Sequence, residues 1–168
     1  MGFMTDKKGF VAPGILTAAF ILAKFKKRRL AFLLALGVAV GLTDALFHHV
    51  LKPLAGRIRP CHVVDLLKHV GNCTNSLSFP SNHAGNSFAV ATLFSLNYKN
   101  SLLLMFVLAL LVSFSRVYLG QHYPTDVVAG AFCGIIMGYL GYKSIPGILL
   151  GLNSLPKLLK WPNPPKNS

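Results

Sequence analysis

Long apolar stretches constrain this chain more than any other feature of its sequence. Residues 30–51, 101–117 and 124–142 consist mostly of aliphatic and aromatic side chains, residues 80–97 become apolar after a polar start, and a shorter apolar stretch covers residues 9–23. The four longer stretches approach the length of about 20 residues that an α-helix needs to cross a bilayer. A transmembrane β-barrel would require alternating apolar and polar residues, whereas these stretches are continuous. The sequence therefore predicts an all-α, polytopic transmembrane helical bundle.

The composition agrees with a protein embedded in lipid. Of the 168 residues, 53% are hydrophobic and 12% are charged, whereas soluble domains carry about 25% charged residues. The length suits one domain, so we expect residues 1–168 to form a single membrane domain. The net charge of +13 suits both anchoring at anionic lipid head groups and an anionic substrate. Because the basic residues are scattered between the stretches, no nucleic-acid partner is expected.

The apolar stretches and the basic residues around them predict a topology. A basic cluster at residues 24–29 follows the first stretch, and clustered positive charge beside a span marks its cytoplasmic end. Alternation of five spans then places the N-terminus and the loop at residues 52–80 outside. Prolines interrupt residues 144–168, so we expect an interfacial tail there, with a sixth span as the alternative.

The same alternation brings three polar clusters to one face of the membrane. The first follows the second span, the second begins the third span, and the third joins the fourth span to the fifth. This convergence depends only on counting spans, and it predicts an active site at the outer membrane face. The clusters are Lys52 with Arg59; Ser81, Asn82 and His83; and Arg116, His122 and Asp126.

One use of these clusters is to bind an anion. Lys52, Arg59 and Arg116 supply three cations, enough to hold a phosphate or a pyrophosphate. Ser81 adds a hydroxyl, and a helix that begins there offers free backbone N–H groups and the positive end of its dipole. Purely structural roles stay open as alternatives, because arginines can extend to lipid head groups and Ser81 can serve only as an N-cap.

The remaining groups suit phosphoryl transfer through a covalent intermediate, which needs a nucleophile and a proton donor. His122 lies four residues before Asp126 and can be the nucleophile that the carboxylate orients. His83 can be the general acid, although an interfacial histidine with a structural role is the alternative. A metal is not expected, because three nearby cations would repel a divalent ion.

Helical spacing predicts a further group behind the site. Asp44, His48 and Lys52 follow i, i+4 and i+8, which places them on one helix face. Asp44 and His48 form either a structural polar pair within the bundle or a second layer that supports Lys52. Arg57, between the two basic residues of the first cluster, is interpreted as a lipid-facing or auxiliary base.

The cysteines leave one question open. Cys61 and Cys73 share the polar loop between the second and third spans, so they can form a disulfide if that loop lies outside the cytoplasm. The sequence cannot supply the geometry that such a bond requires. Cys133 lies in an apolar stretch and is expected to serve packing.

Three segments resemble motifs of a known family. Residues 52–60, KPLAGRIRP, are similar to the Lys-x6-Arg-Pro motif of the type 2 phosphatidic acid phosphatase (PAP2) superfamily. Residues 80–83, PSNH, resemble its Pro-Ser-Gly-His motif, with Asn82 in place of Gly. Residues 115–126 match its Ser-Arg-x5-His-x3-Asp motif. Each motif alone is modest evidence, whereas three in this order and on one membrane face are specific.

This resemblance implies a membrane lipid phosphatase that works without a metal or other cofactor, through a phosphohistidine. It implies that His122 is the nucleophile, that Asp126 is its partner, and that His83 protonates the leaving group. Because Asn82 carries a side chain where the family has Gly, it can contact the substrate or restrict the loop. The phosphate-binding positions that the resemblance implies are Lys52, Arg59, Ser81, Asn82 and Arg116.

The expected substrate is a lipid phosphate in the outer leaflet of a bacterial inner (plasma) membrane, with the active site facing the periplasm or the exterior. The compact chain and the short outer loop resemble both the small lipid A 1-phosphatases and the undecaprenyl pyrophosphatases. The expected substrate is the 1-phosphate of lipid A, with undecaprenyl pyrophosphate and phosphatidylglycerophosphate as alternatives. The sequence predicts no oligomeric state.

Two other functions compete with this one. Vanadate-dependent haloperoxidases share the three motifs, but they are soluble, whereas this chain is strongly apolar. A non-catalytic lipid-binding or transport protein could also keep these residues, although the complete set of reactive and phosphate-binding side chains favours an enzyme.

Overall fold

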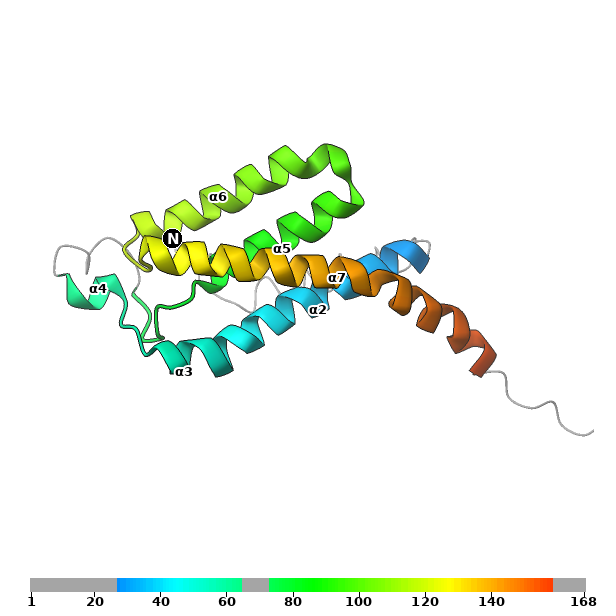
Figure 1. The fold of residues 1–168 in the computed structure, drawn as a ribbon, viewed down its shortest axis with the longest axis horizontal. Coiled ribbons are helices and arrows are strands. Elements are labelled where there is room, and N and C mark those ends of the chain that lie inside the picture. Colours follow the sequence, from blue (N-terminus) through cyan, green and yellow to red (C-terminus); the bar gives the residue numbers. More distant parts are fainter. Residues whose placement is uncertain (1–26, 65–72, 159–168) are drawn as a thin grey trace, which may run out of the picture.

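The computed structural model describes residues 27–64 and 73–158. Within these ranges all regular structure is helical, which confirms the all-α prediction for the described part (Figure 1). The expected first span at residues 9–23 lies outside the described residues. The described elements are α2 (Lys27–Leu46), the π-helix η1 (Phe47–Leu51), α3 (Lys52–Ala55), α4 (Pro60–Val63), α5 (Asn82–Asn97), the 3-10 turn η3 (Lys99–Ser101), α6 (Leu102–Tyr118) and α7 (Pro124–Leu158).

Three helical segments are long and apolar enough to cross a membrane: Lys27–Val63, Lys99–Tyr118 and Pro124–Ser154. The helix α5 has 16 residues and is therefore about 24 Å long, shorter than a hydrocarbon core of about 30 Å. The four helices expected between residues 30 and 142 are all present. The total of five or six spans, and the side of the membrane on which the site lies, stay predictions.

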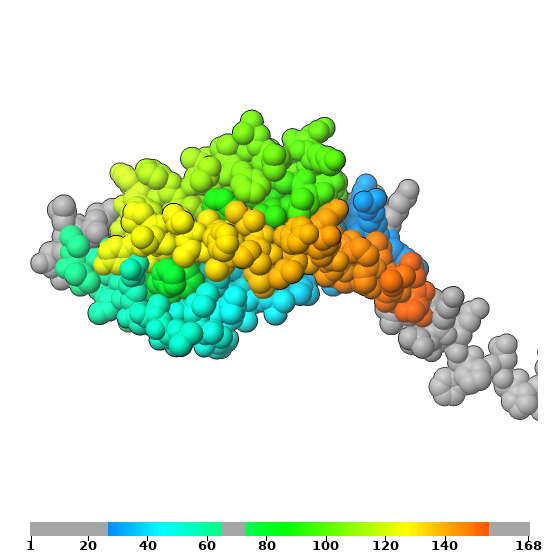
Figure 2. Space-filling view, in the orientation of Figure 1, coloured from blue at the N-terminus to red at the C-terminus, as the bar shows by residue number. Residues whose placement is uncertain are grey.

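The helix α5 lies among the other three long helices and contacts each of them. Figure 2 shows α7 crossing the face of the molecule, with α6 on one side of it and most of α2 on the other, while α5 runs behind α7 and is visible on both sides. Most large apolar side chains of α6 point outward, Leu103 and Phe114 being 78% and 67% exposed. An apolar surface of this kind suits a helix that faces lipid.

A row of glycines brings α7 against α5. Gly130, Gly134 and Gly138 recur every four residues of α7 and face α5. A Cβ atom added at Gly134 would collide with the backbone oxygen of Gly85, and one added at Gly130 would lie 2.6 Å from the backbone oxygen of Ser81. Small residues at this spacing let two membrane helices approach until their backbones touch. The contact sets the start of α7 beside the start of α5, where the polar clusters meet.

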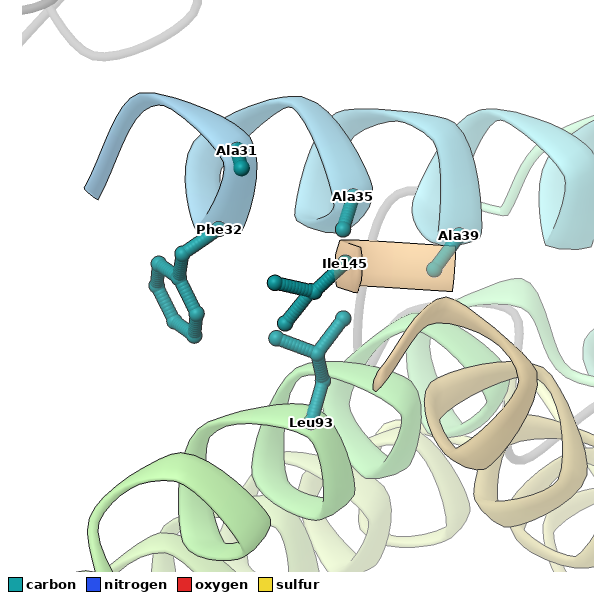
Figure 3. Close-up of a cluster of buried hydrophobic side chains, with 6 residues drawn as sticks. All are labelled: Ala31, Phe32, Ala35, Ala39, Leu93 and Ile145. Carbon is teal, nitrogen blue, oxygen red and sulfur yellow. The ribbon is translucent and has the colours of Figure 1, made fainter. Parts of the chain in front are cut away.

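The main apolar core lies toward the other end of the bundle, where α2, α5 and α7 meet (Figure 3). Packing in this core explains why α7 is longer than the 124–142 span expected from the sequence. Proline inside a helix removes one backbone hydrogen bond, but packed neighbours make it tolerable in membrane helices, and α7 continues through Pro146 to Leu158. The buried members of this core are Ala31, Phe32, Ala35, Ala39, Leu93 and Ile145.

Candidate active site

The predicted clusters do meet at one end of the bundle, where α3, α4, the end of α6 and the starts of α5 and α7 lie together (Figure 1). Lys52 begins α3 directly after the π-helical turn and is buried. Its ammonium donates hydrogen bonds to the carbonyl oxygens of Leu77 (2.8 Å) and Pro80 (3.0 Å). An ammonium group has three N–H donors, and two of those of Lys52 are used in these bonds among the described residues.

Arg59 is buried and connects three segments of the site. Its guanidinium donates to the carbonyl oxygen and the hydroxyl of Ser76, both at 2.8 Å, and to the carbonyl oxygen of Gln121 at 3.0 Å. Its Nη1 also lies 3.2 Å from Nε2 of His122. Because a guanidinium only donates, Nε2 must accept, and the proton of the neutral imidazole lies on Nδ1.

That proton points toward Asp126. Nδ1 of His122 lies 3.6 Å from Oδ2 of Asp126, which is longer than a hydrogen bond, and Nδ1 has no hydrogen-bond partner within the described residues. Both side chains are buried. Catalytic hydrogen bonds are often long in the absence of substrate and shorten when it binds. The pair therefore has the orientation of a carboxylate-supported imidazole, with the contact not yet closed.

The environment of His122 keeps its imidazole neutral. Burial, followed by the positive charges of Arg59 and Lys52, lowers the pKa of His122 to about 4, although the Asp126 carboxylate acts in the opposite direction. His122 lies between α6 and α7 rather than inside either helix. A neutral imidazole is the nucleophilic form, so the ring can react at every pH well above this value.

The start of α5 supplies the second cluster. Ser81 is the N-cap residue, and its hydroxyl accepts a hydrogen bond from the N–H of Ala84 (3.5 Å). Its own N–H donates to the carbonyl oxygen of Asp126 (3.1 Å). The N-terminus of α5, with the positive end of its helix dipole, therefore lies beside the start of α7, and such helix starts are common anion-binding sites.

His83 and Arg116 complete the set at the rim. His83 is exposed and lies close enough to Arg116 and Arg59 to interact with both electrostatically. Arg116 is half-buried and donates to the side-chain oxygen of Gln121 at 3.3 Å. The buried Lys52, Arg59 and His122 thus form the floor of the site, with His83 exposed at its rim.

Asn82 has a partner that the sequence did not indicate. Its side-chain amide donates to Asp44 Oδ1 at 2.6 Å, and Asn86 donates to the same oxygen at 3.0 Å. The residue that replaces the family's Gly is therefore held against α2.

Only part of the expected face of Asp44, His48 and Lys52 is present. Asp44 binds α5 and lies close enough to Lys52 to interact with it electrostatically, whereas His48 is exposed. The π-helical turn at Phe47–Leu51 lies between them, and its i→i+5 hydrogen bonding breaks the 3.6-residue period on which the prediction depended. His48 contacts the ring of His49, at a centroid distance of 5.0 Å.

Sequence reasoning missed Ser78, and it left two roles open for Arg57, a lipid-facing or an auxiliary base. The structure favours the auxiliary role, because Nη1 of Arg57 lies 2.7 Å from Oδ1 of Asp126. The hydroxyl of Ser78 donates to Oδ2 of the same carboxylate. The spacing of the first motif gave no sign of this pairing, because it depends on the path of the chain between α3 and α5.

Cys61 and Cys73 form a disulfide, with their Cα atoms 6.1 Å apart. The N–H of Cys61 donates to the carbonyl oxygen of Gly120 (3.0 Å), which ties α4 to the junction before α7. Within the described part, Cys61, His62 and Cys73 are the one group of metal-ligand types with its ligand atoms close together. Because the two sulfurs are bonded to each other, neither is a thiolate that could bind a metal.

Comparison with known proteins agrees with this geometry. Residues 14–148 match the family model of the PAP2 superfamily. A lipid A 4'-phosphatase of Bacteroides thetaiotaomicron is 36% identical over 123 residues, which cover 69% of this chain and 55% of the relative. A second lipid A 4'-phosphatase, from Porphyromonas gingivalis, is 30% identical over 77% of this chain and 59% of the relative.

The chain thus spans between half and two thirds of the length of these two relatives. Among solved structures, a crystal structure of a transmembrane PAP2 type phosphatidylglycerolphosphate phosphatase from Bacillus subtilis is similar, with a TM-score of 0.55 and 28% identity. The similarity covers 92% of this chain and 72% of that one. The family match over most of the chain, together with the site that its motif residues form, shows that this protein belongs to the PAP2 superfamily.

Proposed function

We propose that this chain is a membrane lipid phosphatase that transfers a phosphoryl group to His122 and then to water. The contact between Arg59 Nη1 and His122 Nε2 carries the proposal. It places a phosphate-binding guanidinium directly at the nitrogen that would attack, within a buried site. A phosphate that draws Arg59 onto its oxygens frees the lone pair of Nε2 at the same moment.

In the first step, Nε2 of His122 attacks phosphorus, and the bond from phosphorus to the lipid oxygen breaks. His83 enters this step as an imidazolium, which the negative charge of a bound phosphate favours, and gives its proton to that oxygen as the lipid leaves. The ring of His122 becomes positive when Nε2 bonds phosphorus, and the Asp126 carboxylate then stabilises the Nδ1–H group. Lys52, Arg59 and Arg116 would balance the negative charge on the phosphoryl oxygens.

In the second step, water attacks the phosphohistidine. His83, now neutral, takes a proton from the water as the new bond to phosphorus forms, and the bond to Nε2 breaks. Inorganic phosphate leaves, and both histidines return to their starting states. No metal takes part in these steps, so chelation should leave the activity intact.

For the substrate, we propose a lipid A phosphate. The relatives from Bacteroides thetaiotaomicron and Porphyromonas gingivalis are both lipid A 4'-phosphatases, which favours the 4'-phosphate over the 1-phosphate predicted from the sequence. Undecaprenyl-diphosphatase and phosphatidylglycerophosphatase B are also the names of relatives, at 34% and 35% identity over shorter regions. These lipids are therefore the competing substrates for a direct comparison.

For the location, we propose the inner membrane of a bacterium, with the site facing the periplasm or the exterior. The disulfide between Cys61 and Cys73 supports this orientation, because such bonds persist in oxidising compartments. The disulfide lies at the same end of the bundle as His122. The N–H of Cys61 in α4 donates a hydrogen bond to the carbonyl oxygen of Gly120, in the junction that carries His122.

The test is phosphate release by the purified protein from a panel of lipids: lipid A with a single phosphate at position 1 or 4', undecaprenyl pyrophosphate and phosphatidylglycerophosphate. Each is measured with and without EDTA, and with a His122→Ala variant. We expect the highest kcat/KM with lipid A 4'-phosphate, no effect of EDTA and no release by the variant. Release that survives His122→Ala would refute the mechanism. A wild-type protein that binds these lipids without releasing phosphate would instead indicate a non-catalytic lipid-binding or transport function.

A further inference from the structure

The carboxylate of Asp126 has more partners than a simple His–Asp pair requires. The side chain is fully buried, and a buried charge must be paired and hydrogen-bonded. Oδ1 is 2.7 Å from Nη1 of Arg57. Oδ2 accepts hydrogen bonds from the hydroxyl of Ser78 and from the N–H of Tyr123, the latter at 2.9 Å. His122, at 3.6 Å, is the most distant of these four neighbours.

The Arg57 guanidinium is itself held in place. Gly56 ends α3 in the left-handed conformation (φ 58°), which turns the chain so that Arg57 faces α7. The guanidinium lies over the ring of Tyr123 (5.1 Å) and donates to the hydroxyl of Thr125 (2.8 Å). The N–H of Ser78 donates to the carbonyl oxygen of Arg57 (2.7 Å). The two groups that grip Asp126 are thus fixed to each other through the backbone.

We propose that Arg57 and Ser78 are positioning residues, which hold the Asp126 carboxylate turned so that Oδ2 faces Nδ1 of His122. The proposal rests on the proposed function, since it assigns these residues through the nucleophile. Arg57 fixes one oxygen, and Ser78 with the Tyr123 N–H fixes the other, so the carboxylate cannot rotate away. The gap to His122 can then close when the ring becomes positive during phosphoryl transfer.

A different role for Arg57 would be direct binding of the substrate phosphate, because 42% of its side chain is exposed. The two roles have different kinetic consequences. A phosphate ligand acts on substrate affinity and on inhibition by inorganic phosphate or vanadate. A positioning residue acts on kcat and on the titration of His122. Its effect disappears when Asp126 is replaced by a residue without a carboxylate.

The titration has a predicted direction. The charged groups that face His122 are Arg59, Lys52 and Asp126, while α5 and α6 bring His83 and Arg116 to the same site. Loss of the Arg57 cation leaves the negative charge of Asp126 less neutralised, which favours the imidazolium form of His122. Arg57→Gln should therefore move the acid limb of kcat/KM to higher pH.

The experiment compares Arg57→Gln, Arg57→Lys and Ser78→Ala, each alone and combined with Asp126→Asn, against Arg28→Gln as a matched loss of one exposed arginine outside the site. Thermal unfolding of each variant in detergent checks that it folds. We expect Arg57→Gln and Ser78→Ala to lower kcat by about tenfold to a hundredfold, the effect of one lost charge-assisted hydrogen bond. Arg57→Lys should recover part of that loss. In the Asp126→Asn background, either change should cost less than about twofold.

Several results would overturn the proposal. They are an unchanged kcat with a raised KM for Arg57→Gln, a full additional loss in the Asp126→Asn background, or an acid limb that stays in place. An NMR titration of the histidine rings measures the shift of His122 without substrate. If the wild type releases no phosphate from any lipid but this titration shifts in Arg57→Gln, the proposed function fails and the positioning role stands. If the wild type is active and Arg57→Gln behaves like Arg28→Gln, the positioning role fails alone.

Discussion

Replacing Gly134 with alanine should move α7 away from α5 and reduce both stability and activity. A Cβ atom at Gly134 would collide with the backbone oxygen of Gly85, whereas ordinary contacts lie at 3.4–4 Å. Neither atom can rotate away, because both belong to packed helices, so we expect the helices to separate by roughly 1 Å. Overpacking costs about 1–3 kcal/mol, and the better helix propensity of alanine offsets about 1 kcal/mol. The net loss of unfolding free energy is then up to about 2 kcal/mol.

Activity should suffer more than stability. Asp126 and His122 lie at the start of α7, while Ser81 and His83 lie at the start of α5, so separation of these helices changes the distances between them. A displacement of about 1 Å between reacting groups can cost about a hundredfold in rate. We therefore expect kcat to fall by up to that factor in a protein that is still folded at the assay temperature.

The assay combines calorimetric unfolding in detergent with phosphate release. Gly147→Ala is the matched control, because it makes the same change in the same helix where a Cβ atom would meet nothing within 4 Å. It should leave kcat unchanged and stability equal or slightly higher. If Gly134→Ala matched Gly147→Ala in both measurements, the inference that backbone contact between α5 and α7 sets the site would be refuted.

Three further predictions concern pH, the disulfide and Asn82. Burial, then Arg59 and Lys52, lower the pKa of His122 to about 4. Arg59→Gln removes one positive neighbour and favours the imidazolium, so it should move the acid limb of kcat/KM to higher pH than in the wild type. An unmoved limb would contradict this origin of the shift. Reduction of the Cys61–Cys73 bond, with its sequence separation of 12, should lower the unfolding free energy by about 3 kcal/mol. The loss should appear as a lower Tm in dithiothreitol, whereas a protein with both cysteines changed to serine should not respond to the reductant. An identical Tm of the wild type with and without reductant would argue against the bond. Because Asn82 donates to Asp44 at 2.6 Å, Asn82→Gly and Asp44→Asn should show a coupling of about 0.5–3 kcal/mol in a double-mutant cycle of thermal stability, and strictly additive losses would count against that contact.

The parts of the site that the sequence predicted are those that depend on chain order and on helix direction. Alternating apolar stretches brought Lys52, Ser81 and His122 to one end of the molecule, and the described helices place them there. The pairing of side chains across elements could not be predicted in this way. Arg57 reaches Asp126 only because Gly56 turns the chain, and no spacing rule contains that turn.

Regular periodicity also failed where the helix is irregular. The face expected for Asp44 and His48 assumed an unbroken α-helix, and the π-helical turn at Phe47–Leu51 removed that condition. The length of α7 is underestimated by the sequence because prolines interrupt residues 144–168, whereas α7 continues through Pro146 and packs against α2 and α5 there. The glycines of α7 were visible in the sequence, but their meaning depends on what lies opposite them.

The close contact of α5 with α7 also distinguishes two groups of site residues: those on helices joined through their backbones, and those that reach the site only through side chains. The hydrogen bond from the N–H of Ser81 to the carbonyl oxygen of Asp126 joins the backbones of these helices at the reaction centre. The other helices contribute through long side chains, Asp44 from α2 and Arg116 from α6. A change in α2, or in the part of α6 away from Arg116, can therefore alter what the site admits without moving the groups proposed to react. Divergence in substrate choice is expected in those segments, and constancy of the chemistry on α5, on α7 and at the phosphate-binding side chains.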